Sequence, residues 1–291
     1  MKTYFDCIPC FVRQALAAAR YVTDDETVQE QVLREALQAA AEMDLRQSPP
    51  AMAQRIHRAV RRLTGVADPY RAAKDHFNEV AGAMYPALEA EVRASDRPLE
   101  TAVRFAIAGN VIDLGIQDQL SEADVYEAVA HARDAALRAD LEELASDAAA
   151  AGSILYLADN AGELVLDRLL IEQLGTEKVT VAVKGAPILN DATRPDADAA
   201  GLTETVEVID NGSDAPGTLL DDCSDTFRER FAEADLVLAK GQGNYETLSQ
   251  APREVYFVLK AKCPVIAEDL GCEVGSLVLR KSTPAPAPTG R

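Results

Sequence analysis

The sequence predicts an α/β protein in which an all-helical N-terminal half precedes a mostly parallel sheet. Up to about residue 151, apolar residues recur at the spacing of helices, and few β-branched runs occur. After that point, short apolar runs alternate with polar loops and helical patterns, which is typical of parallel strands with helices on both faces of the sheet. We expect a helical domain over 1–151, an α/β domain with the functional site over 152–281, and a disordered Pro/Ala-rich tail over 282–291.

The first half is expected to form a helical bundle or cap that contributes no strand. Ile8 and Phe11 begin a helical repeat in the first helix, and Thr23-Asp24-Asp25 marks the start of the second. Further helices are expected at 50–63, 70–92, 98–112, 121–135 and 138–150. Pro86 lies inside the fourth expected helix, at 70–92, and is expected to kink or end it.

The second half is expected to supply the sheet. Short apolar runs predict strands at 153–158, 178–183, 206–209, 235–239, 255–259, 265–267 and 276–279. Helices are expected at 162–174, 223–233 and 246–252. In open α/β sheets, ligands bind where the carboxyl ends of the strands meet, so the polar residues that follow these strands are the candidates for function.

Charge and composition limit the function classes. The 291 residues include 29 Lys and Arg against 48 Asp and Glu, a net charge of −19. A surface of this sign repels nucleic acid phosphates, so no nucleic-acid partner is expected; adaptation to high salt is one interpretation of the acidity. No secretion signal and no apolar stretch near the roughly 18 residues of a membrane span occur, which indicates a cytoplasmic protein without a membrane partner. The oligomeric state is not indicated.

The five cysteines are an odd number and do not predict a disulfide framework. Cys7 and Cys10 form a CxxC at the start of the first helix, where the helix N-terminus would lower a thiol pKa and permit redox or metal chemistry. A structural pair is an equal alternative, and a meeting of the pair with Cys272 near the cleft is a third. The three histidines lack partners at metal-ligand spacing, so histidine catalysis is not expected.

The first polar cluster, Asp159 to Glu163 (DNAGE), follows the strand at 153–158. Asp159 and Asn160 offer the hard oxygen ligands that suit Mg²⁺ or Mn²⁺. Gly162 opens the following helix, so that its N–H groups can face an anion. A helix N-cap is an alternative role for the Asp-Asn pair, and Glu163 receives no role.

The second cluster, KGAPILNDAT, begins at Lys184 after the strand at 178–183. A lysine at a strand end can meet a phosphate. Asp191 lies one crossover after Asp159 and would be close enough in a parallel sheet to complete a metal site. Alternatively, Lys184 is a surface charge and Asn190-Asp191 is part of a turn.

Two further segments carry polar residues. KGQGNYE begins at Lys240 after the strand at 235–239, and its glycines permit close approach to a ligand, although it is neither a Walker A loop nor a GxGxxG fingerprint. In AGNVIDLG, Gly109 would allow close backbone approach, and Asn110 and Asp113 would share one helix face. A capping Asn110 and a solvated Asp113 are the simpler interpretation of that segment.

In this order, CIPCFVRQAL, AGNVIDLG, DNAGE, KGAPILNDAT and KGQGNYE resemble the DUF89 family of metal-dependent damage-control phosphatases, and they are most similar to its prokaryotic subgroup with an N-terminal CxxC. The resemblance covers the chain short of its tail. It implies a Rossmann-like three-layer α/β/α sandwich with an all-helical N-terminal domain. It also implies hydrolysis of small phosphate monoesters, such as sugar phosphates or damaged phosphometabolites.

The resemblance implies roles for particular residues. Asp159, Asn160 and Asp191 would hold a divalent cation, Mn²⁺, Co²⁺, Ni²⁺ or Mg²⁺. Asp159 and Lys240 would be catalytic, with Lys240 facing the substrate phosphate. It also implies that Asn110 and Asp113 line the cleft. Independently of the resemblance, we expect Lys184, Gly241 and Asn244 to bind the substrate together with them.

The residue chemistry agrees with that activity. The preferred mechanism is in-line attack of a metal-bound water on phosphorus, with Lys240 and Lys184 neutralising the developing charge. The competing mechanism forms an aspartyl-phosphate. Two other function classes stay open: a methyltransferase that uses S-adenosylmethionine, although a glycine-rich loop is missing after the first strand, and a non-enzymatic metal-binding protein.

Overall fold

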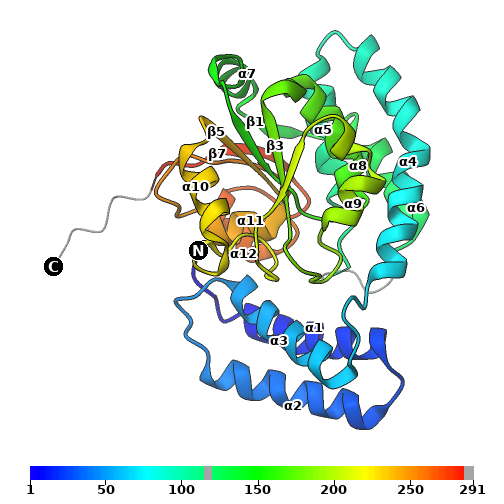
Figure 1. The fold of residues 1–291 in the computed structure, drawn as a ribbon, viewed down its shortest axis with the longest axis vertical. Helices are drawn as coiled ribbons and strands as arrows, with labels where there is room; N and C mark the ends of the chain where they lie inside the picture. The colour runs from blue at the N-terminus through cyan, green and yellow to red at the C-terminus, as the bar shows by residue number, and fades with distance from the viewer. Residues whose placement is uncertain (115–119, 285–291) are drawn as a thin grey trace, which may run out of the picture.

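A seven-stranded sheet forms the centre of the computed structural model, which describes residues 1–114 and 120–284 (Figure 1). The strands are β1 (Leu137–Ala139), β2 (Ile154–Leu157), β3 (Val179–Val183), β4 (Glu207–Asp210), β5 (Leu236–Lys240), β6 (Tyr256–Lys260) and β7 (Leu277–Lys281). Their order is β1-β7-β6-β5-β2-β3-β4, and only β6 and β7 pair antiparallel. The predicted α/β fold with a mostly parallel sheet is confirmed.

Helices cover both faces of this sheet. One face, with Tyr156 and Val181, packs against α4 (Arg71–Ala94), α5 (Pro98–Gly109), α6 (Glu122–Ala132), α7 (Leu141–Ala150), α8 (Glu163–Leu174) and α9 (Arg194–Ala199). The opposite face, with Leu155 and Val237, packs against α10 (Asp225–Glu233), α11 (Gly241–Leu248) and α12 (Pro264–Leu270). Short 3₁₀ turns lie at η1 (Thr176–Lys178), η2 (Leu202–Glu204) and η3 (Leu220–Asp222). Because successive strand residues point to opposite faces, β2 contributes to both cores.

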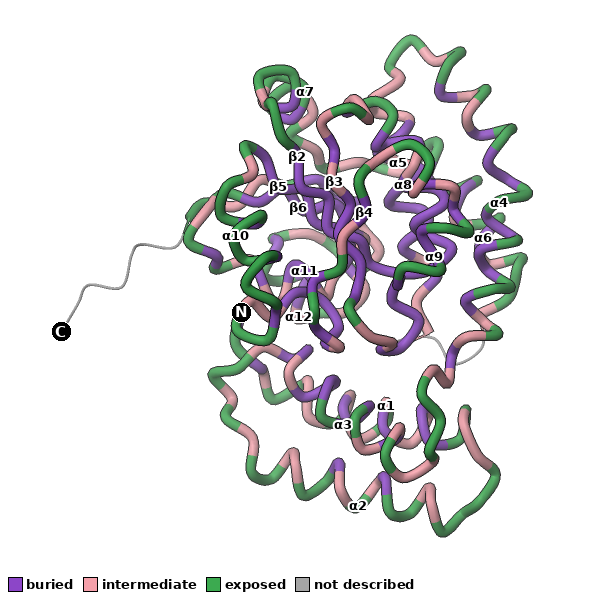
Figure 2. The backbone as a smooth tube through the Cα atoms, in the orientation of Figure 1, coloured by how far each residue is buried: buried purple, intermediate pink, exposed green. Residues whose placement is uncertain are grey.

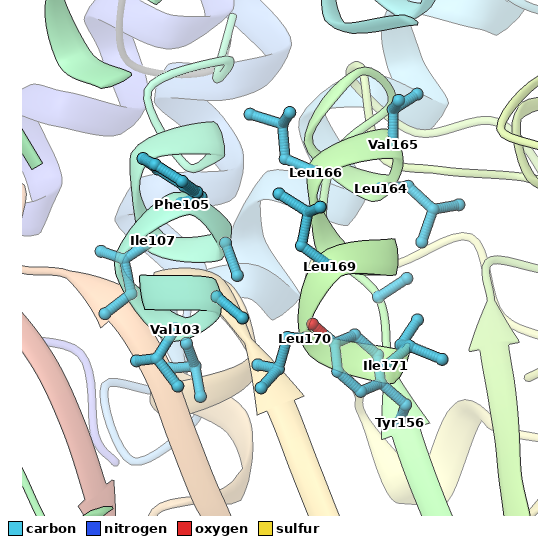
Figure 3. Packing of buried hydrophobic residues seen from close by; sticks show 14 of the residues in the cluster. Val103, Phe105, Ile107, Tyr156, Leu164, Val165, Leu166, Leu169, Leu170 and Ile171 are labelled. Carbon is cyan, nitrogen blue, oxygen red and sulfur yellow. The ribbon is translucent and has the colours of Figure 1, made fainter. Parts of the chain in front are cut away.

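The contact between α5 and α8 positions the start of α8. Helices α5 and α8 lie side by side, and the buried side chains of Phe105 and Ile107 on α5 belong to the same core as those of Leu166 and Leu169 on α8 (Figure 3). Full burial of each such side chain contributes about 1.5–3 kcal/mol. Gly109 at the end of α5 lies so close to α8 that a Cβ there would be 3.2 Å from the Glu163 Cα. The packing therefore brings the end of α5 against the DNAGE segment.

The first three helices, α1 (Cys7–Val22), α2 (Glu26–Glu42) and α3 (Pro49–Thr64), have a separate core that includes Phe11 and Ile56. They lie below the sheet in Figure 1, and much of α2 is exposed or half-buried in Figure 2. Arg58 and Arg61 of α3 form ion pairs with Asp214 in the loop after β4. These arginines therefore attach the three helices to the α/β part.

Two strand expectations are wrong. β1 (Leu137–Ala139) lies in the half expected to be wholly helical, and it pairs parallel with β7. Three residues are too few to show the period of a strand. The run at 265–267, expected to be a strand, is part of α12, which begins at Pro264 and ends before Gly271. A short apolar run does not distinguish a strand from a buried helix.

Helix boundaries also differ from expectation. α11 begins at Gly241, directly after β5, rather than at 246. α4 continues through Pro86, and α9 (Arg194–Ala199) was not expected. Within the described residues, no helix combines the length and apolar character that crossing a membrane requires.

The division of the chain at residue 151 stays a prediction. The packing favours a different grouping, because α4 to α7 share one core with the sheet and only α1 to α3 have a core of their own. The tail expected over 282–291 falls mostly on 285–291, which lie outside the described residues.

Candidate active site

Three adjacent strands end at the edge of the sheet where the polar clusters lie. β2 pairs with β3 on one side and with β5 on the other, so chain connections diverge from β2 in both directions. Ligands bind in the crevice at such a switch point. Asp159 and Asn160 follow β2, Lys184 follows β3, and Lys240 is the last residue of β5.

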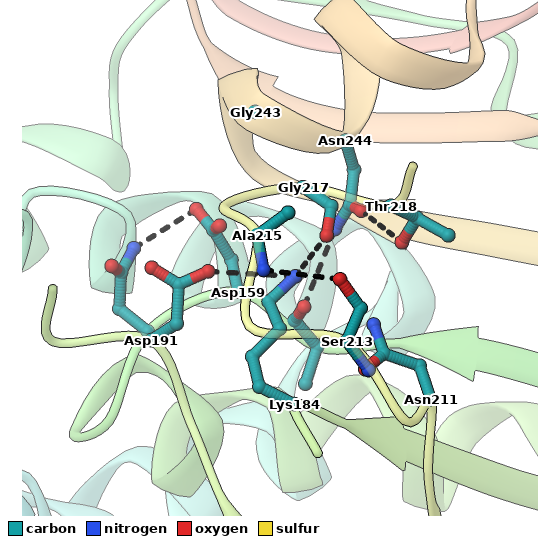
Figure 4. Close-up of polar contacts among 12 residues, drawn as sticks. Asp159, Lys184, Asp191, Asn211, Ser213, Ala215, Gly217, Thr218, Gly243 and Asn244 are labelled. Atoms are coloured by element: carbon teal, nitrogen blue, oxygen red, sulfur yellow. Dashed lines mark hydrogen bonds and ion pairs between the residues drawn. The ribbon is translucent and has the colours of Figure 1, made fainter. Parts of the chain in front are cut away.

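The backbone of the second cluster, which begins at Lys184, pairs with the backbone of the DNAGE segment. Asn160 and Asp191 form an antiparallel bridge, and the Ala192 N–H donates to the Asp159 carbonyl at 2.7 Å. Leu189, just before the bridge, has a positive φ of 46°, an uncommon conformation for a residue with a side chain. Figure 4 shows the Asp159 and Asp191 carboxylates next to each other. Asp159, Asn160 and Asp191 are thus brought together as expected.

The oxygens of these residues suit a hard cation. Asp191 Oδ2 is buried and accepts no hydrogen bond within the described residues, although Lys184 Nζ lies 3.4 Å away. Burial, followed by the nearby charges of Glu163 and Asp191, raises the pKa of Asp159 well above its usual range. Burial also raises the pKa of Asp191 to about 6, against the effect of Lys184. A cation would favour the ionised form of both carboxylates.

The donor set is small. Within the described residues, no cluster of three or more His, Cys, Asp and Glu residues is arranged to hold a metal ion. The set here is two carboxylates and one amide, which are the oxygen ligands that Mg²⁺ and Mn²⁺ take while keeping several waters. Histidine is absent from the described lining of the adjoining cavity.

A cavity of about 480 Å³ lies beside these oxygens. Its walls come from α1, α3 and the loops at the carboxyl edge of the sheet, and they include Asp159, Asn160 and Asp191. Lys262 and Arg13 are the basic residues of its described lining. Lys262 Nζ lies 2.6 Å from Asp113 Oδ2. The cavity therefore joins a wall of carboxylate and amide oxygens to cationic side chains.

Lys240 does not face this cavity. Its ammonium group is fully buried and donates to Glu163 Oε1 and Asp167 Oδ1, each at 2.6 Å, and to the Ala106 carbonyl at 2.9 Å. All its hydrogens are therefore used inside the protein. The expectation that Lys240 meets the substrate phosphate is corrected on this geometry.

Gly241 and Asn244 support the site without lining the cavity. Gly241 has a φ of +79°, and a Cβ there would lie 1.7 Å from Asp159 Oδ2. Asn244 is fully buried; its amide donates to the Lys240 carbonyl at 2.7 Å and its oxygen accepts from the Thr218 hydroxyl at 2.7 Å. Their expected contact with substrate is replaced by internal roles: Gly241 makes room for Asp159, and Asn244 secures the turn into α11.

Lys184 and Gly162 are occupied by protein partners. Lys184 is buried, donates to the Gly217 carbonyl and pairs with Asp191. It is absent from the cavity lining, so its role here is to balance Asp191. The Gly162 N–H donates to Asn78 Oδ1 of α4 at 2.6 Å, so that group is not open to an anion as expected.

Asn110 and Asp113 have different surroundings. Asn110 is the C-cap of α5 and is fully buried, and its Nδ2 donates to Asp159 Oδ2 at 3.0 Å. Asp113 lies beyond the helix, lines the cavity and pairs with Lys262. The structure brings both to the site, Asn110 behind Asp159 and Asp113 on the cavity wall.

The CxxC also reaches the cavity. Cys7 and Cys10, at the start of α1, line it together with Cys263, whereas Cys272 is not part of its described lining. Burial raises the pKa of the Cys7 thiol, opposite to the lowering expected at a helix N-terminus. Cys263 and Lys262 were missed, although both follow the strand expected at 255–259 and therefore lie at the same sheet edge.

A mostly parallel sheet whose switch point carries two carboxylates and an amide, beside a cavity lined by Lys262 and Arg13, is typical of enzymes that act on small anionic substrates with a divalent cation. The family model described as the damage-control phosphatase ARMT1-like domain matches residues 3–278. The chain belongs to this family, also called DUF89, and the resemblance carried by the five motifs is confirmed.

Relatives match almost end to end. A damage-control phosphatase of Archaeoglobus fulgidus is 37% identical, over 94% of this chain and 97% of the relative. A damage-control phosphatase of Pyrococcus horikoshii is 33% identical, over 97% and 99%. An uncharacterised protein of Methanocaldococcus jannaschii is 35% identical, over 95% and 94%.

A crystal structure of a DUF89 protein from P. horikoshii has a TM-score of 0.86 and 33% identity, and the match covers 97% of this chain and 100% of that one. The family and these relatives support a phosphatase activity that depends on a divalent metal and acts on phosphorylated small molecules. They do not support the methyltransferase or metal-storage alternatives.

Proposed function

We propose that this chain hydrolyses small phosphate monoesters, such as sugar phosphates or damaged phosphometabolites, in the cavity between α1, α3 and the carboxyl edge of the sheet. Asp159, Asn160 and Asp191 would hold the divalent cation. The observation that carries this proposal is the buried Asp191 Oδ2 beside Asp159 at the cavity wall, which accepts no hydrogen bond within the described residues and has the Lys184 ammonium 3.4 Å away. A buried carboxylate oxygen without a hydrogen bond is costly, and a cation would reduce that cost.

When bound, a hard dication polarises a phosphoryl oxygen and lowers the pKa of water. The chain's own residues bind and orient the ester around it. Lys262 lines the cavity, and its Nζ would exchange its contact with Asp113 for a substrate phosphate oxygen. Lys262 thus takes the role that Lys240, being enclosed, does not fill.

Water is the proposed nucleophile. Asp159 Oδ2 already accepts hydrogen bonds from Asn110 and Asn160, at 3.0 and 2.9 Å, and Gly241 packs against the same oxygen. This restraint disfavours movement of the carboxylate toward phosphorus. Trapping of ³²P on the protein after an acid quench would support the competing aspartyl-phosphate instead.

The volume limits the substrate. A cavity of about 480 Å³, walled on one side by α1 and α3, accommodates a phosphorylated small molecule. Its acidic residues are compatible with a dianionic phosphate only when a dication is present, because Lys262 and Arg13 are the basic groups of the described lining.

Removal and return of the metal test the proposal. Protein dialysed against EDTA should release no phosphate from p-nitrophenyl phosphate or from a panel of sugar phosphates, and Mn²⁺, Co²⁺, Ni²⁺ or Mg²⁺ should restore turnover. Asp191→Asn should bind the cation more weakly in calorimetric titration. Full activity in EDTA, or unchanged cation affinity in Asp191→Asn, would refute the proposed site.

A further inference from the structure

A buried group of charges lies directly behind the proposed cation site. Glu163, Asp167 and Lys240 each have a side chain with no exposed area. Glu163 and Asp167 stand four residues apart on α8, so they occupy one helix face, and Lys240 reaches both from the end of β5. The cation site as proposed does not use these three residues.

Glu163 accepts hydrogen bonds from two side-chain amides in front of it. Asn160 Nδ2 donates to Glu163 Oε2 at 2.8 Å and to Asp159 Oδ2 at 2.9 Å. Asn110 Nδ2 donates to Glu163 Oε2 at 3.0 Å and to Oε1 at 3.2 Å. Because Lys240 also donates to Oε1, every contact of this carboxylate is a donor, and the two amides must turn their NH₂ groups toward it.

A separate contact agrees with this orientation of Asn110. Its Oδ1 faces the other way and accepts from the Lys260 backbone N–H at 3.3 Å. A backbone N–H can only donate, so that contact requires the amide oxygen. In Asn160, an NH₂ group that faces Glu163 leaves Oδ1 on the side away from Glu163. Asn160 is also one of the residues that line the cavity.

We propose that Glu163, held in place by Lys240, is a positioning residue that turns the Asn160 amide so that its carbonyl oxygen faces the cation. This inference rests on the proposed function, since it concerns the same cation site. An amide has one oxygen and one NH₂ group, and only the oxygen can bind a cation. Asp159 Oδ2 accepts one hydrogen of the Asn160 NH₂ group, and without Glu163 the other hydrogen would lose its acceptor, so that the amide could turn a donor toward the cation and repel it.

Glu163→Gln tests the proposal with little change of shape. The introduced glutamine would keep its oxygen toward Lys240 and place an NH₂ group where Oε2 meets Asn160 at 2.8 Å. Two donors would then face each other, and Asn160 would turn its NH₂ group toward the cation. We expect Mn²⁺ affinity, measured by calorimetry or by electron paramagnetic resonance titration, to fall by about 10–100-fold, as for lost partners of other metal ligands.

The double variant Glu163→Gln with Asn160→Asp separates positioning from a loss of charge. It keeps the net charge of the wild type. The introduced aspartate has two oxygens, so it accepts from the introduced glutamine and still offers an oxygen to the cation. We expect the double variant to bind Mn²⁺ more tightly than either single variant. Asn160→Asp alone should bind weakly, because its new carboxylate would face the Glu163 carboxyl group, and both offer acceptors.

Glu172→Gln is the matched control, since Glu172 lies on the same helix but contacts Tyr85 away from the cavity. It should bind Mn²⁺ like the wild type. Wild-type affinity in Glu163→Gln, or no recovery in the double variant, overturns the inference. If the wild type itself binds no cation, or if Asp191→Asn binds normally, the proposed function fails instead.

A measurement on the wild type covers the case in which Glu163→Gln does not fold. With ¹⁵N-labelled asparagine, the Asn160 NH₂ signals are those missing from Asn160→Asp. They should stay protected from hydrogen exchange when Mg²⁺ is added, because they face Glu163. Fast exchange in the Mg²⁺ form would overturn the inference.

Discussion

The cavity wall and the cluster behind it are built from the same residue types but differ in how their charges are satisfied. On the wall, Asp191 keeps an oxygen without a hydrogen bond, and Lys262 lines the cavity. Behind it, Lys240 uses all its hydrogens on Glu163, Asp167 and a backbone carbonyl. Asp167 Oδ2 behind the wall also lacks a hydrogen bond within the described residues, so the difference between the two regions lies in their lysines: Lys240 is enclosed and holds its cluster together, whereas Lys262 lines the cavity.

Asp159→Ala should have the largest effect on activity. It removes a proposed cation ligand from the wall, and metal assistance is worth several kcal/mol, so metal-dependent release of p-nitrophenol should fall by about 10³-fold or more. Asp134→Ala, which changes an exposed carboxylate outside the cavity, should keep full activity. Retained activity in Asp159→Ala would show that this wall of the cavity takes no part in the mechanism.

Lys240→Met and Lys262→Met compare the two lysines directly. Lys240→Met leaves two buried carboxylates without their cation and should lower the free energy of unfolding by about 3–5 kcal/mol in urea titrations. Lys262→Met removes the partner of one carboxylate, Asp113, rather than of two fully buried ones, so it should lower stability less than Lys240→Met, and it should raise KM because Lys262 lines the cavity. A reversed pattern would show that the assignment of the two lysines is wrong.

Gly241→Ala should disturb the wall through packing alone. A Cβ at Gly241 would lie 1.7 Å from Asp159 Oδ2, whereas at Gly65, with a φ of +72°, a Cβ would meet nothing within 4 Å. Both substitutions carry a backbone strain of about 1–2 kcal/mol, and Gly241→Ala should lose more stability than Gly65→Ala in thermal unfolding because Asp159 must also move. Only Gly241→Ala should also lose Mn²⁺ affinity; equal affinities in the two variants would contradict the close contact.

Glu246→Gln, at a residue that also lines the cavity, should have its clearest effect in the pH dependence of stability. Burial, against the opposing effect of its hydrogen bond with Gln242, raises the pKa of Glu246 from 4.5 to about 7. The folded protein therefore holds this proton more firmly than the unfolded chain, and the stability it contributes is lost as pH rises through 7.

The measurement uses metal-free protein at pH 5 and pH 8. From the lower to the higher pH, Glu246→Gln should gain on the order of 2 kcal/mol of stability relative to the wild type. Parallel pH curves for the two proteins would exclude this carboxyl as the source.

The α/β class could be predicted because hydrophobic periodicity is a local property. Strand β2, with all four residues buried, is visible as an apolar run, and so are β3 and β5. β1 could not be found, since its three residues are in the sheet only because β7 pairs with them from 140 positions later, Leu137 with Leu277.

The positions of the candidate oxygen ligands could be predicted from the sequence, but the surroundings of the lysines could not. Leu236, Leu238 and Lys240 share one face of β5, because strand residues alternate, and that face packs against α8. The Glu163 and Asp167 spacing on α8 was the signal that could have revealed a buried partner for Lys240. A lysine at a strand end looks the same in sequence whichever side it faces.

Local sequence pattern was enough to place Asp159, Asn160 and Asp191 at the carboxyl ends of neighbouring strands, because strand ends and turns follow from that pattern. Which charges face the cavity and which are enclosed was settled by the packing of the whole chain. That choice depends on contacts between distant segments, such as Lys240 with Ala106, 134 residues apart, and Lys262 with Asp113, 149 apart. Such contacts form when α5 packs on α8, and no local pattern encodes them.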